Sequence, residues 1–216
     1  MQELWLYRSQ LLQGLTLTIE LTVLSGLLAF ALSLAAGTGM LSRSRAARLL
    51  CRVYVEFFRG TSLLAQMFWL FFVLPNFGID LSPIVCGVWS LGLCFGAYGA
   101  EIVRSSLTSL PKGQYDAAIA LNFSRLKALR VIYLPQSMLL MLPLFANLSI
   151  ELLKATSLVS LITIADLTFQ AKNLIFLTYD TARILILVLV VYFGLSLIIS
   201  RSLRLLEQAM AKSWHG

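Results

Sequence analysis

The chain has 216 residues, of which 59% are hydrophobic and only 12% are charged, and its mean hydropathy is +0.85. A soluble domain carries about 25% charged residues, so this composition excludes a soluble globular protein and predicts an integral membrane protein. The net charge of +7 reflects an uneven placement of Lys and Arg about the membrane, so no nucleic acid partner is expected.

Five apolar stretches are long enough to cross a membrane as helices, which takes roughly 20 apolar residues. They cover residues 15–41, 53–74, 84–103, 137–153 and 184–200. The alternating pattern of a membrane β-barrel is absent, and helices satisfy their own backbone polar groups in lipid. The sequence therefore predicts an all-α membrane protein of five transmembrane helices, with residues 1–216 forming a single domain.

The basic residues predict the orientation of these helices. Thirteen of them follow the first, third and fifth stretches, and four lie on the other side. Because cytoplasmic loops are enriched in Lys and Arg, we expect the N-terminus outside and the C-terminus in the cytoplasm. The first stretch is not expected to be a signal peptide, because its basic residues follow the apolar run instead of preceding it. The thirteen are Arg43, Arg45, Arg48, Arg52, Arg59, Arg104, Lys112, Arg125, Lys127, Arg130, Arg201, Arg204 and Lys212, and the four are Arg8, Lys154, Lys172 and Arg183.

The residues used for catalysis and metal binding are scarce. His215 is the single histidine, which excludes a metal site built on several histidines, and the sequence offers no Ser/His/Asp arrangement or glycine-rich phosphate loop. Cys86 and Cys94 lie about 12 Å apart along one predicted helix, too far for a disulfide. We therefore expect no enzyme activity, metal or cofactor in this chain.

A polar segment, residues 112–136, separates the third and fourth stretches and is cytoplasmic on this topology. Asn122 can take the left-handed conformation that ends a helix, and Ser124 is suited to cap a second one. We expect Pro135 to close that second helix. The segment thus predicts a helix, a turn and a helix, although its composition also suits one amphipathic helix lying on the membrane surface.

The spacing in this segment resembles the cytoplasmic "EAA" loop of ABC-importer permeases. In that family Glu-Ala-Ala is followed after three residues by Gly, and after nine more by Ile-x-Leu-Pro; here Asp replaces Glu and Asn replaces Gly. The resemblance implies that residues 111–136 dock in a groove of a separate ATP-hydrolysing subunit. The matching residues are Asp116, Ala117, Ala118, Asn122, Ile132, Leu134 and Pro135.

Further segments resemble the polar amino-acid permeases, of the histidine and glutamine type. They are residues 56–64 (EFFRGTSLL), 100–104 with 112–114, and 153–158 (LKATSL), and the likeness covers residues 15–206. Residues 96–101 and 150–170 look most similar to permeases for ectoine and hydroxyectoine.

The resemblance implies a type I ABC-importer permease fold in the bacterial inner membrane, carrying a zwitterionic solute such as a polar amino acid, ectoine or hydroxyectoine. The implied partners are an ATPase dimer that binds ATP and Mg²⁺, a second permease (a relative or a copy of this chain), an external solute-binding protein and membrane lipid. An ion-coupled secondary transporter is the alternative, but such transporters generally show internal repeats, and none is found here.

Polar residues inside the apolar stretches are candidates for the solute path, because a charge at the centre of a membrane helix costs at least about 2.5–3.5 kcal/mol. Glu151, with Asn147 one turn before it and Lys154 less than one turn after it, forms a polar stripe. The stripe can offer a carboxylate and an ammonium to a zwitterion, or Glu151 and Lys154 can simply pair with each other. Other candidates for the solute path are Glu20, Thr156 and Ser157.

Two further charged pairs are spaced three residues apart near the cytoplasmic ends of their helices. Glu56 with Arg59 and Glu101 with Arg104 are expected to be structural ion pairs, since this spacing brings side chains together on a helix. A contact at a gate is the alternative role.

Overall fold

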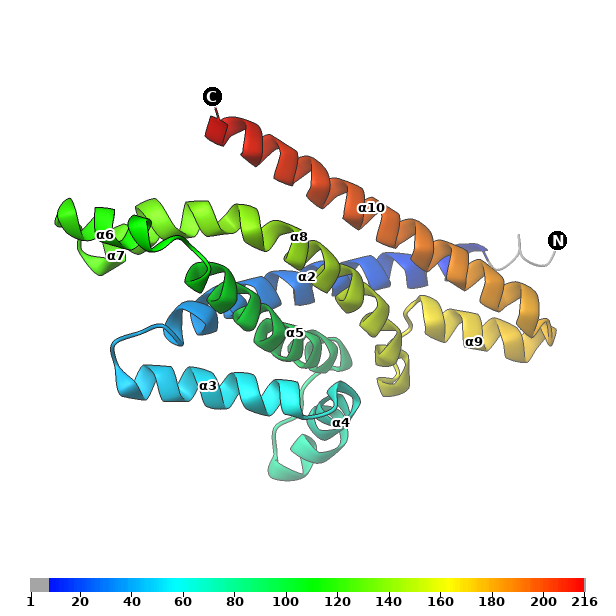
Figure 1. The fold of residues 1–216 in the computed structure, drawn as a ribbon. Helices are drawn as coiled ribbons and strands as arrows, with labels where there is room; N and C mark the ends of the chain where they lie inside the picture. Colours follow the sequence, from blue (N-terminus) through cyan, green and yellow to red (C-terminus); the bar gives the residue numbers. More distant parts are fainter. Residues whose placement is uncertain (1–7, 216) are drawn as a thin grey trace.

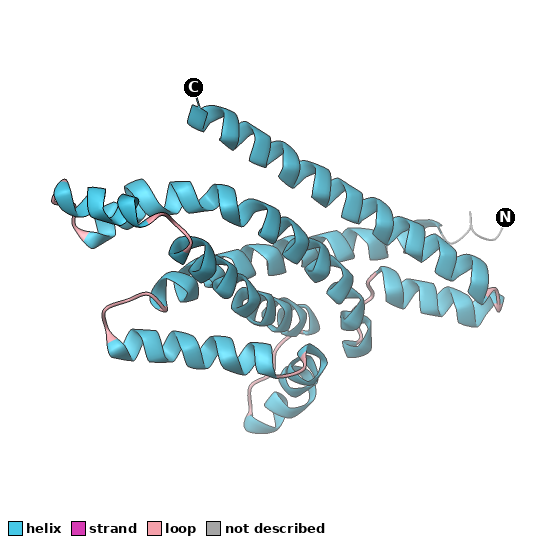
Figure 2. Cartoon of the chain, viewed as in Figure 1, coloured by secondary structure: helices cyan, strands magenta, loops and turns pink. Residues whose placement is uncertain are grey.

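The computed structural model describes residues 8–215, without the side chains of residues 125, 126 and 211–215. The side chains of Arg125, Lys212 and His215, which entered the sequence analysis, thus lie outside the described part. All regular structure from residue 8 to residue 215 is helical (Figures 1 and 2). The elements are α2 (Arg8–Gly39), α3 (Arg45–Gly60), α4 (Leu63–Phe68), η1 (Trp69–Val73), η2 (Leu74–Phe77), α5 (Pro83–Thr108), α6 (Lys112–Ala120), α7 (Arg125–Ala128), η3 (Leu129–Tyr133), α8 (Leu134–Ala155), η4 (Thr156–Ile162), α9 (Leu167–Thr178) and α10 (Thr181–His215).

Helix α5 is the core of the bundle. Its apolar window is 61% buried, against 28% for α2 and 6% for α10. Small residues allow this close packing: a Cβ added at Gly99 would lie 2.0 Å from Ser33 Oγ, and one at Gly96 would lie 2.9 Å from Leu32 Cβ. The Ser33 hydroxyl donates to the carbonyls of Ala29 and Gly96, so α2 and α5 also share a polar contact inside the apolar core.

Within residues 8–215, four helical stretches are long and apolar enough to cross a membrane: Arg8–Gly39, Pro83–Thr108, Leu129–Ile162 and Thr181–Met210. They correspond to the first, third, fourth and fifth predicted spans. A fifth span is present if the bent pair Arg45–Gly60 and Leu63–Phe77 is counted as one.

The second predicted span, residues 53–74, is not one straight helix. The chain bends by 101° between α3 and α4, where Thr61 and Ser62 take extended backbone conformations. The Gln66 amide stabilises the break by donating to the carbonyl of Phe58 and to Thr61 Oγ1, at 3.1 and 2.7 Å. Hydropathy indicates only that the run is apolar and does not predict this bend.

The polar segment forms the predicted helix and turn but not the predicted end. Asn122 has a φ of 53°, in the left-handed region, and Ser124 Oγ accepts the backbone N–H of Lys127. Pro135 does not close a helix, because α7, η3 and α8 follow one another without a break. The π-helical turn η3 ends at Tyr133, two residues before Pro135, and lets the helix accommodate a residue that has no N–H to donate.

Helix α9 lies at the opposite end of the bundle from α6 and α7 (Figure 1). Asp166 caps α9, since its carboxylate accepts the backbone N–H groups of Phe169 and Thr168 at 2.9 and 3.2 Å. Thr18 of α2 accepts the N–H of Leu167, so α2 and α9 meet at a buried polar contact. Burial raises the pKa of Asp166 from about 3.8 to about 6, although the two N–H groups oppose this shift.

Candidate translocation face and coupling loop

Helix α8 carries its polar stripe on an exposed face. Asn147, Glu151 and Lys154 are all exposed, as are Leu140 and Leu144 on the same side, because residues three and four apart share one face of a helix. Among the described side chains no ion pair joins Glu151 to Lys154, whereas Arg104 pairs with Glu101 and Arg183 with Asp180. Both charges are therefore free to meet a partner outside this chain.

The other candidates for the solute path differ in their exposure to solvent. Glu20 is exposed on α2. Ser157 is half-buried and donates to the Lys154 carbonyl. Thr156 is fully buried and donates to the Leu153 carbonyl at 2.7 Å. In this structure the Thr156 hydroxyl is thus enclosed and already bonded, and its place on the solute path stays a prediction.

One of the two predicted ion pairs is formed. Arg104 Nε donates to both carboxylate oxygens of Glu101, at 3.0 and 3.1 Å. The predicted pair of Glu56 and Arg59 is absent from the ion pairs of the described chain. The Arg59 guanidinium instead lies 5.3 Å from the centre of the Tyr98 ring, because packing of α3 on α5 brings an aromatic face within reach of the arginine.

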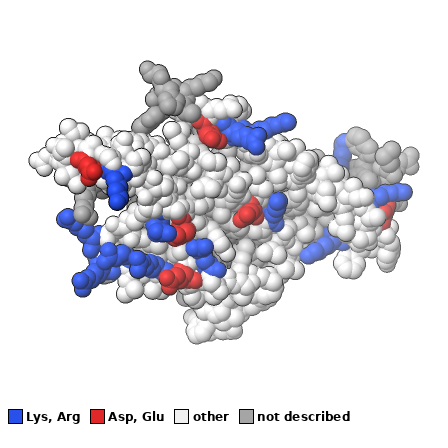
Figure 3. All heavy atoms as spheres, viewed as in Figure 1, with Lys and Arg blue, Asp and Glu red and all other residues white. Residues whose placement is uncertain are grey.

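These charges share one face of the molecule. In Figure 3, acidic and basic side chains lie over α3, α5 and α8, with uncharged surface around them. Each charge would be costly against lipid. We therefore take this face, with the stripe of α8 and the charges of α3 and α5, as the candidate translocation face.

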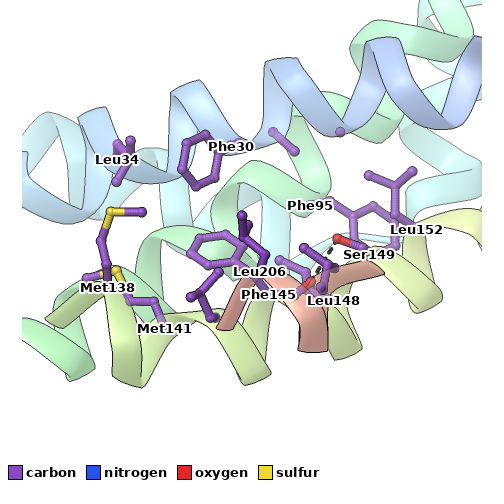
Figure 4. Close-up of a pocket in the computed structure, with 14 residues that line it drawn as sticks. Phe30, Leu34, Phe95, Met138, Met141, Phe145, Leu148, Ser149, Leu152 and Leu206 are labelled. Carbon is purple, nitrogen blue, oxygen red and sulfur yellow. Dashed lines mark hydrogen bonds between the residues drawn. The ribbon is translucent and has the colours of Figure 1, made fainter. Parts of the chain in front are cut away.

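A separate cavity between α2, α8 and α10 has a different character. It has a volume of about 190 Å³ and an almost wholly apolar lining that includes Phe30, Met141, Phe145 and Leu206 (Figure 4). Its polar group, the Ser149 hydroxyl, already donates to the Phe145 carbonyl. A zwitterion would lose its hydration here without gaining hydrogen bonds, so this cavity is not a solute site.

The coupling loop, residues 111–136, presents apolar side chains to solvent. Ile119 is 75% exposed and Leu121 is 64% exposed, and exposed apolar groups close together mark a surface that another protein covers. Ala117 and Asp116 are also exposed, whereas Ala118 is only 2% exposed and packs against this chain itself. The sequence analysis missed Ile119, which its apolar character in a polar segment could have indicated.

The remaining residues of the loop pattern hold its shape. Asn122 makes the turn, while Ile132, Leu134 and Pro135 are half-buried where η3 joins α8. The Tyr115 hydroxyl donates to the Leu107 carbonyl at 2.6 Å, and burial raises the pKa of Tyr115. Gln136 and Gln114 are joined by a hydrogen bond of 3.0 Å. These contacts tie α6 to the ends of α5 and α8.

Comparison with known proteins places the chain among transport proteins. Residues 28–212 match the family described as the binding-protein-dependent transport system inner membrane component. The chain is 46% identical to a probable amino-acid ABC transporter permease of Sinorhizobium fredii, over 97% of this chain and 90% of that protein. It is 37% identical to an L-cystine permease of Bacillus subtilis, over 74% of this chain and 69% of that protein.

A solved structure agrees with these relatives. The structure of an amino acid ABC transporter with histidines superposes on the chain with a TM-score of 0.88 and 31% identity, covering 96% of this chain and 97% of that one. The fold is therefore that of a type I ABC-importer permease. These comparisons do not support the resemblance to ectoine permeases or the ion-coupled alternative.

Proposed function

Since the chain belongs to the family of binding-protein-dependent transport system inner membrane components, it is a permease subunit of a bacterial ABC importer in the inner membrane, and we propose that its solute is a small zwitterionic amino acid. A transport component of this kind moves solute and leaves ATP hydrolysis to a separate subunit. The named substrates of the relatives, amino acids and cystine, are the support for the solute class.

The observation that carries the proposal is the unpaired polar stripe of α8. Glu151 and Lys154 are both exposed and are not paired with each other. Within lipid such charges would be very costly, so water, solute or a second permease must cover them. A carboxylate and an ammonium on one helix face match the ammonium and carboxylate of a free amino acid.

The partners follow from the same arrangement. A second permease, either a relative or a copy of this chain, closes the translocation face, and an external binding protein delivers the solute. An ATPase dimer, holding ATP and Mg²⁺, docks on the coupling loop through Ile119 and Leu121. The loop passes the movement of the ATPase to α5 and α8, to which Tyr115 and Gln136 connect it.

The test is uptake into proteoliposomes that contain the permease, its ATPase and its binding protein. Radiolabelled cystine, glutamine and histidine are supplied outside, with ATP on the ATPase side. We expect ATP to drive uptake of at least one of them and a non-hydrolysable analogue to abolish it. Uptake driven by a sodium or proton gradient without ATP would contradict the proposal.

A further inference from the structure

A second cavity lies where the end of α2, the end of α5 and the coupling loop meet. Its volume is about 710 Å³, and it is open to the surface. Ala35 to Arg43 supply one wall, Leu107 of α5 supplies another, and α6, Phe123 and η3 close the rest. None of these residues belongs to the translocation face, so the cavity is a separate feature of the surface.

The cavity is positioned at a membrane boundary. Its wall from α2 is the last turn of an apolar span that ends at Gly39, and Ser42 and Arg43 follow two residues later. In Figure 3 a group of Lys and Arg side chains lies at the same end of the molecule, over the start of α3 and beside α6. Lipid headgroups lie at the level where an apolar span gives way to charged residues.

The lining of the cavity is amphipathic. Leu41, Leu107 and Phe123 provide hydrocarbon surface, while Ser42 and Arg43 provide a hydroxyl and a positive charge. A ligand that fits both parts must carry an apolar chain and a negatively charged polar head. A small polar metabolite would leave the apolar surface uncovered, and a fatty chain alone would leave the guanidinium unpaired.

The charge at the rim is unpartnered within the described chain. Arg43 is exposed, and no hydrogen bond or ion pair among the described residues holds it. Arg45 and Arg48 follow on the adjoining helix and add to the positive potential. Anionic lipids of the cytoplasmic leaflet are attracted to such basic clusters.

From these observations we propose that the cavity binds one anionic phospholipid, with its phosphate at Arg43 and an acyl chain against Leu41, Leu107 and Phe123. Ser42 lies beside Arg43 in the lining of the cavity and supplies a hydroxyl donor for a phosphate oxygen. The lipid comes from the cytoplasmic leaflet, at the end of the molecule where the basic residues gather.

The bound lipid supports the coupling loop. Tyr115, Ala118 and Ile119 of α6 line the same cavity, so an acyl chain there packs against the helix that leads to the exposed Leu121. On the proposed function, the lipid thus stiffens the element that transmits movement from the ATPase. Losing it weakens the coupling of ATP hydrolysis to transport without removing either subunit.

Lipid retention by the full-length permease tests the site without depending on transport. The protein is purified in mild detergent with dioleoyl phosphatidylglycerol or dioleoyl phosphatidylcholine, and native mass spectrometry counts the lipids that remain bound. We expect about one retained phosphatidylglycerol per chain and about tenfold less of it for Arg43→Gln, with recovery in Arg43→Lys. Arg45→Gln is the matched control, because Arg45 is a neighbouring arginine outside the cavity, and it should retain the lipid.

Variants that fill the cavity give a second, independent test of lipid retention. Ala35→Phe places a ring at the cavity wall and should reduce retention, whereas Ala31→Phe, one turn earlier on α2 and outside the cavity, should not. Equal losses in Arg43→Gln and Arg45→Gln, or equal retention of phosphatidylcholine, would overturn the proposal. So would displacement by soluble glycerol 3-phosphate, which would indicate a phosphate site, or displacement by the ATPase subunit, which would identify that protein as the occupant.

Discussion

Glu151 and Lys154 carry opposite charges on one face of α8 but form no ion pair with each other in the described structure. Their spacing of three residues permits an ion pair, yet both side chains are exposed and no ion pair joins them among the described residues. Arg104 and Glu101 have the same spacing and do pair. The difference indicates that the α8 residues are placed to meet a partner beyond this chain.

Exchange of the two charges separates a solute site from a structural pair. We predict that Glu151→Gln lowers ATP-driven amino-acid uptake by about tenfold to a hundredfold, because a charge-assisted contact contributes about 1.5–3 kcal/mol. The double variant Glu151→Lys with Lys154→Glu should stay impaired, since a solute site has fixed neighbours. Solute-free ATPase activity of the assembled complex should persist, and Asp180→Asn, which alters a surface pair, should transport normally. Wild-type uptake in the double variant would show that the pair is only structural.

Asp166 gives the protein a predictable dependence on pH. Its pKa in the folded chain is about 6, above the ordinary value of 3.8, because it is fully buried. A raised acid pKa means that the folded state binds the proton more tightly than the unfolded chain. The stabilising contribution is therefore complete below about pH 3.8 and is lost as pH rises through about 6, with a limit of about 3 kcal/mol.

Asp166→Asn is the variant that isolates this effect. Its amide oxygen can still accept one N–H at the start of α9 but does not titrate. We predict that the unfolding temperature of the wild type, relative to Asp166→Asn, falls between pH 4.5 and pH 7. A difference that stays constant across this range would show that Asp166 does not change its protonation within it.

At the scale of the elements, the exposed apolar side chains of Ile119 and Leu121 are the part of the coupling loop that we expect the ATPase to contact. We predict that Ile119→Asp leaves the permease folded in the membrane but detaches or uncouples the ATPase, because a charge would enter an apolar interface without a partner. The control is Ile79→Asp, which changes an isoleucine that is 51% exposed in the loop before α5. Co-purification of the ATPase and ATP-driven uptake measure the result. Normal co-purification and uptake in Ile119→Asp would exclude this helix from the interface.

The elements also show where sequence reasoning succeeds and where it stops. The left-handed Asn122 and the cap at Ser124 were predictable, because their side chains act on the local backbone. The bend between α3 and α4 was not, since Thr61 and Ser62 are common residues and the Gln66 amide that stabilises the break is identified only in the folded chain. The burial of Thr156 could not be predicted for a similar reason, because it depends on elements distant in the sequence.

At the scale of the whole molecule, the bent pair of helices determines how many times the chain crosses the membrane. Figure 1 places the start of α3 and the end of α5, which leads to α6 and α7, at one end of the bundle, and α9 at the other. If α3 and α4 together cross the membrane, residues 76–82 lie on the same side as α9. A pair that turned back within the membrane would leave residues 76–82 on the side of Arg43 and the end of α5 on the other side, which disagrees with the cavity that Arg43 and α6 line together.

A reporter that is active only in the cytoplasm distinguishes these two arrangements. Basic residues favour the cytoplasmic side. If the chain crosses the membrane five times, thirteen of its seventeen Lys and Arg lie on the same side. We predict activity for fusions after Pro111 and after Gly216, and none for fusions within residues 76–82. Activity at residues 76–82 together with none after Pro111 would show that the bent pair is re-entrant, which would move the coupling loop out of reach of a cytoplasmic ATPase. Because the docking role of Ile119 requires a cytoplasmic loop, that single result would also remove the physical basis of the coupling prediction.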